Sequence, residues 1–118
     1  MTYHIDQLHP GMSASMAKTV TEADIILFSG VSTDVNPAHI DEEYAKTTMF
    51  GGRIAHGMLS ASFISAVLGN QLPGNGCIYV SQSLKFKAPV RPGDTVKATV
   101  TVKEVNVAKN RVILDTVC

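Results

Sequence analysis

The sequence contains no tryptophan, only two cysteines, and no excess of charge of either sign. Ten Lys and Arg residues balance ten Asp and Glu residues, so long-range attraction to nucleic acid or to an anionic membrane is not expected. No apolar run approaches the roughly 18 residues that a bilayer-spanning helix needs. The first residues also lack the basic and apolar regions of a signal peptide. We therefore expect neither a nucleic-acid partner nor a membrane association.

The two cysteines, Cys77 and Cys118, show no spacing typical of a metal site. Cys118 is the last residue of the sequence, which disfavours a structural disulfide between the two. This cysteine usage predicts a reducing compartment, and we expect the protein in the cytoplasm.

The 118 residues, 45% of them hydrophobic, are enough for one domain with its own core, which we place at residues 1–118. Residues 12–20 predict a strand. Thr21 resembles a helix N-cap with Asp24 completing a capping box, and the helix should end near residues 30–33. Asp41 is expected to cap a short helix over residues 42–47.

Residues 57–68 predict a second helix whose apolar and small side chains leave no charged face, as in a buried helix. Gly69 and Asn70 should end it. Alternation then predicts strands over residues 77–88, 95–103 and 111–118. Antiparallel strands together with a buried helix indicate an α+β fold.

The segment after the first helix carries an acid, an amide and an imidazole within six positions: Asp34, Asn36 and His39. Pro37 disfavours helical geometry, so we expect irregular backbone on which Asp34 and His39 converge. A carboxylate beside an imidazole can move protons near neutral pH. The same residues are also typical of a turn-forming Asp and of a His bonded to backbone. A third interpretation, a metal site, combines acidic and imidazole ligands without a recognised spacing: Asp34, His39, Asp41 and His56.

His56 and Gly57 lie at the start of the predicted buried helix. A helix N-terminus presents unpaired N–H groups and a partial positive charge, and Gly57 has no side chain to keep a ligand oxygen away. This end could therefore stabilise a developing oxyanion. Alternatively, Gly57 only permits close packing and His56 substitutes for an N-cap. Ser65, two turns later, could hydrogen-bond near the pair or to its own helix backbone.

These motifs together resemble a known family. The run from Asp34 to His39 reads D-V-N-P-A-H, and residues 54–59 read I-A-H-G-M-L. This combination is similar to the signature of the MaoC-like (R)-specific enoyl-CoA hydratases, and residues 69–74, 81–87 and 89–94 resemble their short members that supply polyhydroxyalkanoate synthesis. The similarity extends from about residue 7 to the end.

The resemblance implies a hot-dog fold, in which an antiparallel sheet curls around one long helix and two chains form a homodimer. It implies that trans-2-enoyl-CoA is hydrated to (R)-3-hydroxyacyl-CoA, with Asp34 and His39 as catalytic dyad and the Gly57 N–H bound to the thioester oxygen. Asn36, Ser65 and His56 take supporting or substrate-binding roles. No metal and no prosthetic group is implied, because coenzyme A is part of the substrate. The family continues from the strand at residues 111–118 into one more strand, and this sequence stops first, as expected either for a truncated copy or for a sheet that has lost an edge strand.

Two other functions remain open at this point. A hot-dog thioesterase would direct the water at the thioester carbonyl of a similar substrate. A non-catalytic acyl-CoA-binding hot-dog domain would bind the ligand without turnover.

Overall fold

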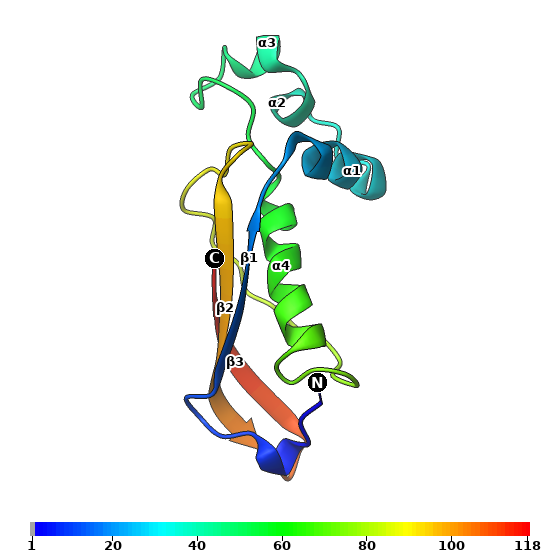
Figure 1. Ribbon diagram of the computed structural model, residues 1–118, viewed down its shortest axis with the longest axis vertical. Helices are drawn as coiled ribbons and strands as arrows, with labels where there is room; N and C mark the ends of the chain where they lie inside the picture. The colour runs from blue at the N-terminus through cyan, green and yellow to red at the C-terminus, as the bar shows by residue number, and fades with distance from the viewer. Residues whose placement is uncertain (1) are drawn as a thin grey trace. The chain divides into compact units, whose positions relative to one another are not determined.

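The computed structural model describes residues 2–118 and contains one antiparallel sheet, one long helix and several shorter helices (Figure 1). The three strands lie in the order β1-β2-β3. These elements confirm the α+β class. Their bounds, in chain order, are η1 Ile5–Gln7, β1 Ser13–Thr19, α1 Glu22–Ser32, α2 Pro37–Ile40, α3 Glu42–Ala45, α4 Gly57–Asn70, β2 Thr95–Asn106 and β3 Arg111–Val117.

Residue contacts divide the chain into two compact units. One comprises the chain up to Ala17 together with Ala61–Ser83 and Lys97–Cys118, and the other comprises Lys18–Ser60 and Leu84–Val96. The assignment of residues 1–118 to a single domain stays a prediction.

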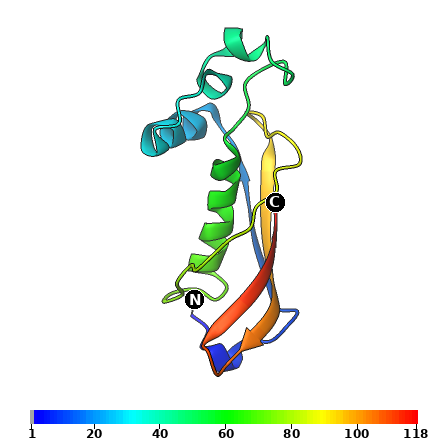
Figure 2. The same ribbon diagram turned by 180° about the vertical axis from the view of Figure 1, so that it is seen from behind.

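The first unit contains most of the sheet and the C-terminal part of α4, which lies beside it (Figure 2). β2 follows the predicted alternation: Ala98, Val100 and Val102 are buried, while Lys97 and Lys103 are exposed. α4 contributes a buried apolar stripe, so the core of this unit combines residues of one helix and one sheet. The stripe consists of Phe63, Ile64, Val67 and Leu68. The helix ends at the predicted pair, Gly69 and Asn70, but includes both residues and is therefore two residues longer than the predicted range 57–68.

The strand predicted over residues 77–88 is absent from the structure, and that prediction was wrong. The segment has the alternating residue pattern of a strand, but within residues 2–118 none of its backbone groups joins the hydrogen-bond ladder of β1, β2 and β3. It reaches the sheet through a side chain, because Gln82 Nε2 donates to Thr116 Oγ1 of β3 at 3.0 Å. Its apolar side chains are solvent-exposed, with Ile78 85% exposed. Alternation alone does not make a strand, since a strand also needs a paired neighbour.

The second unit begins with α1, whose start is as predicted. Thr21 Oγ1 accepts from the Asp24 N–H at 3.1 Å, and Asp24 Oδ2 accepts from the Thr21 N–H at 2.9 Å. Asp24 also pairs with Lys18 at 2.5 Å. The hydrogen bond from Lys18, followed by that from the Thr21 backbone, lowers the pKa of Asp24 from 3.8 to about 2.

After α1, Asn36 caps a one-turn helix, α2, that begins at Pro37. The expectation of irregular backbone is therefore wrong for His39, which lies in this turn. Proline fits the first position of a helix because the N–H it lacks would have no helical partner there. Asp41 caps the next short helix, α3, as predicted. Among the described residues, no helix has both the length and the apolar character to cross a bilayer.

Candidate functional site

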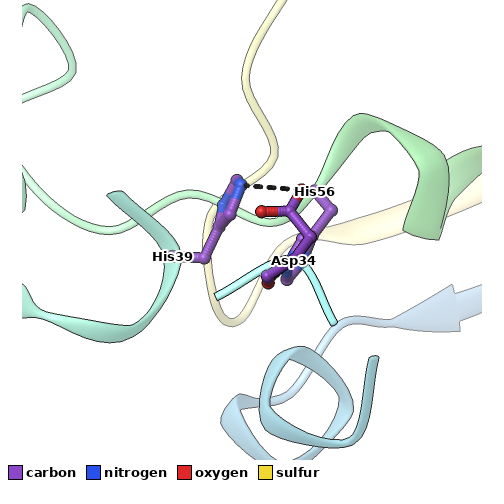
Figure 3. Close-up of side chains that lie close together, drawn as sticks. All are labelled: Asp34, His39 and His56. Carbon is purple, nitrogen blue, oxygen red and sulfur yellow. Dashed lines mark hydrogen bonds and ion pairs between the residues drawn. The ribbon is translucent and has the colours of Figure 1, made fainter. Parts of the chain in front are cut away.

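Asp34, His39 and His56 lie close together in the second unit (Figure 3). Asp34 follows α1, His39 belongs to α2, and His56 directly precedes α4. The His39 Nε2 atom is 4.0 Å from Asp34 Oδ2. The structure thus brings the predicted acid and imidazole together.

Backbone contacts fix the proton position on His39. Its Nδ1 lies 2.8 Å from the carbonyl oxygen of Ile54, which can only accept a hydrogen bond. Nδ1 therefore carries the hydrogen in the neutral ring, and Nε2 keeps its lone pair. The Ile54 N–H also donates to the Ala38 carbonyl at 3.2 Å, so α2 is held against this segment by two hydrogen bonds.

The two carboxylate oxygens of Asp34 face different groups. Oδ1 accepts from the Asn36 N–H at 3.3 Å, as in a turn-forming Asp. Oδ2 faces His39 Nε2, and the Asp34 side chain is 52% exposed while that of His39 is 12% exposed. The turn-forming Asp and the backbone-bonded His are therefore both observed, while Asp34 Oδ2 and His39 Nε2 are left facing each other. The catalytic interpretation of this pair stays a prediction. Asn36 uses its side-chain oxygen on the Ala38 N–H, which supports the loop locally.

His56 is only 2% exposed and stacks on His39, with ring centroids 3.8 Å apart and an interplanar angle of 25°. Its Nε2 lies 2.9 Å from the Asp34 carbonyl oxygen and 3.1 Å from Ser29 Oγ. His56 thus points at Asp34 instead of capping α4 with its side chain. Ser29 was missed by the sequence reasoning. The sequence pattern that could have indicated it is the helical spacing: Ser29 follows Ile25 by four residues and therefore lies on the same, buried side of α1.

Metal binding fits this cluster poorly, although side-chain ligand atoms of all three residues lie within 4.8 Å of one another. An imidazole binds a metal in its own plane, along the nitrogen lone pair. Because the two rings are stacked with an interplanar angle of 25°, these directions lie in two nearly parallel planes and do not meet at one ion. Asp41, the fourth residue of the metal interpretation, instead caps α3 by accepting from the Tyr44 N–H at 3.2 Å.

Gly57 is the first residue of α4, and within residues 2–118 its N–H has no acceptor. A Cβ at this position would lie 2.7–3.0 Å from three ring atoms of Phe86, closer than carbon atoms pack. Glycine is therefore required for the observed position of Phe86 against the start of the helix. The free N–H and the helix dipole make this end a suitable site for a partially negative oxygen.

Arg53 anchors the segment that carries Ile54 and His56. Its guanidinium pairs with Glu22 of α1 and, at 3.2 Å, with Glu42 of α3. Burial acts to lower the pKa of Arg53, but the hydrogen bonds with Glu42 and Glu22 outweigh it and the pKa is raised. Arg91 donates to the Phe50 carbonyl at 2.6 Å and holds the same loop.

Ser65 belongs to the other unit, where it lies on the exposed part of α4. Its supporting role stays a prediction.

Known proteins match almost the whole chain. Residues 7–117 match the family described as MaoC like domain. An (R)-specific enoyl-CoA hydratase from Rhodospirillum rubrum is 61% identical over 116 residues, which are 98% of this chain and 81% of that protein. A solved structure of an (R)-hydratase from Aeromonas caviae, involved in polyhydroxyalkanoate biosynthesis, has a TM-score of 0.89 and 45% identity. It covers 92% of this chain and 83% of its own. An R-hydratase from Pseudomonas aeruginosa has a TM-score of 0.83 at 38% identity, over 96% of this chain and 81% of its own.

Proposed function

The chain belongs to the MaoC-like domain family, and we propose that it hydrates trans-2-enoyl-CoA reversibly to (R)-3-hydroxyacyl-CoA. The fold is the hot-dog arrangement of its structural relatives, an antiparallel sheet with a long central helix. The observation that carries the proposal is the pairing of a lone-pair nitrogen, His39 Nε2, with a carboxylate oxygen of Asp34 at 4.0 Å.

Two hydrogen-bond acceptors that face each other at 4.0 Å suit one water molecule between them. A water about 2.8 Å from each atom would donate one hydrogen to each, at an angle of about 90° between the two bonds. This orientation leaves the water's own lone pairs free to attack carbon. We propose that this water is the hydrating nucleophile.

His39 is the group that takes the proton from the water as its oxygen attacks C3. The carboxylate of Asp34 orients the water and offsets the positive charge that develops on the imidazole. The proton is then delivered from the pair to C2, so that H and OH add to one face of the double bond. The dyad ends each turnover in its starting state.

The negative charge that develops on the thioester oxygen needs a donor that is already in place. We assign this role to the Gly57 N–H together with the dipole of α4. Phe86 lies against Gly57 and would contact the part of the substrate bound there. The proposal needs no metal and no prosthetic group, since coenzyme A arrives with the substrate.

A single assay with crotonyl-CoA tests the function. Hydration removes the conjugated enoyl absorbance without releasing a thiol, and the product should be the (R)-3-hydroxy thioester. Release of free thiol with the double bond intact would instead identify a thioesterase. Binding without either change, and unaltered by His39→Ala, would identify a non-catalytic acyl-CoA-binding domain.

We further propose that the protein acts as a homodimer in the cytoplasm. The exposed apolar residues Ile78 and Val80 lie on an extended segment that has no paired strand within residues 2–118, and a second copy would supply a partner for it. Light scattering should give twice the chain mass at micromolar concentration. A mass that stays at one chain would refute the dimer without affecting the chemistry.

A further inference from the structure

His56 contacts two other rings, with an interplanar angle of 55° to Phe28 and of 25° to His39. Its centroid lies 4.9 Å from that of Phe28 and 3.8 Å from that of His39. The same ring reaches the main chain of Asp34 through Nε2, at 2.9 Å from the carbonyl oxygen. His56 therefore touches both members of the proposed dyad, one by its face and one by its edge.

The contacts of His56 define its tautomer. A carbonyl oxygen only accepts, so Nε2 carries the hydrogen, which the Ser29 hydroxyl oxygen at 3.1 Å shares. Nδ1 is buried, and within residues 2–118 it has no hydrogen-bond partner. Among the described residues, the His56 ring therefore makes its hydrogen bonds through Nε2 alone.

Building on the proposed hydratase reaction, we infer that His56 and Ser29 form a positioning pair for the dyad. The His56 N–H holds the Asp34 main chain, and its ring face fixes the plane of the His39 imidazole. Ser29 holds the His56 ring at the rotation that both contacts require. The pair thereby sets the separation between His39 Nε2 and Asp34 Oδ2, the space in which the water must fit.

Kinetics of single and double variants test this inference. His56→Phe keeps a flat ring against His39 and removes the N–H that donates to the Asp34 carbonyl. We expect kcat to fall about 10²-fold, because this is the effect of misplacing a reacting group by about 1 Å. Ser29→Ala should lower kcat about 3- to 10-fold, as expected for one hydrogen bond. KM should change less than about twofold in both, because both side chains are buried, with His56 2% and Ser29 4% exposed.

A positioning pair must also be coupled. In the His56→Phe background, Ser29→Ala should have no further effect on kcat. Ser13→Ala is the control for loss of one serine hydrogen bond, because Ser13 Oγ donates to the Val100 carbonyl at 3.0 Å in the other unit. It should leave kcat unchanged. A Ser29→Ala effect that is the same in both backgrounds, or one reproduced by Ser13→Ala, would overturn the inference.

A spectroscopic readout separates this inference from the proposed function. Long-range ¹H–¹⁵N spectra of the wild-type protein should show His56 as the Nε2–H tautomer and His39 as the Nδ1–H tautomer. This result does not depend on turnover, and it also decides the case if His56→Phe fails to fold. Observation of the Nδ1–H tautomer for His56 would refute the positioning role even in an active hydratase. Correct tautomers in a protein that does not hydrate crotonyl-CoA would refute the function alone.

Discussion

Replacing Asp34 by Asn removes one charge from the proposed dyad and nearly preserves the shape of the side chain. The amide oxygen can still accept from the Asn36 N–H, so the turn after α1 should persist. At 4.0 Å, a carboxylate stabilises an imidazolium by about 1 kcal/mol in water and about 4 kcal/mol at an effective dielectric constant of 20. The 52% exposure of Asp34 places the value between these limits, at about 2–3 kcal/mol.

A loss of about 2–3 kcal/mol in transition-state stabilisation corresponds to a fall in kcat of about 30- to 150-fold. Loss of one acceptor for the water adds to this effect, so we expect Asp34→Asn to reduce crotonyl-CoA hydration about 10²-fold or more. Asp41→Asn is the matched control, because Asp41 undergoes the same chemical change while it caps α3. It should leave kcat within about twofold of the wild type. If Asp34→Asn folded normally and kept kcat within threefold of the wild type, the dyad mechanism would be refuted.

Three further predictions concern the surroundings of the dyad. Gly57→Ala forces the Phe86 ring to move by about 0.7 Å to reach ordinary contact distance. We expect the free energy of unfolding to stay within about 1 kcal/mol of the wild type, but kcat/KM to fall at least tenfold. An unchanged kcat/KM would contradict the role of this helix end. Arg53→Met removes both carboxylate contacts and should lower the unfolding free energy in urea by about 1–2 kcal/mol, whereas no change would show that the anchor is unimportant. Because the pKa of Asp24 is lowered from 3.8 to about 2, its ionised form stabilises the fold above about pH 4, and this contribution disappears as the pH falls toward 2. Asp24→Asn should therefore show a weaker loss of stability over that range, and a pH profile identical to the wild type would exclude the contribution.

Local features of the sequence were sufficient to predict the elements that depend on local interactions. The capping box of Thr21 and Asp24 specified the start of α1 because both of its hydrogen bonds lie within four residues. The alternation in β2 specified its buried face because that strand has a neighbour on each side. The residue types and spacing of Asp34 and His39 were sufficient to predict that an acid and an imidazole meet, and their catalytic role stays a prediction.

Features that depend on distant contacts could not be predicted in this way. The alternation over residues 77–88 is as regular as that of many strands, but no local signal tells whether a partner strand is available. Ser29 was missed because its significance comes from His56, 27 residues later. Which atoms of Asp34 and His39 face each other likewise depends on the position of the Ile54 carbonyl, which bonds to His39 Nδ1.

The most direct test of the central claim is hydration of crotonyl-CoA in D₂O, followed by determination of the configuration at C2 and C3 of the product. One water held between His39 Nε2 and Asp34 Oδ2, with the proton delivered from the same pair, predicts that deuterium and oxygen enter on the same face, with the R configuration at C3. Addition to opposite faces, or an S configuration at C3, would contradict the account.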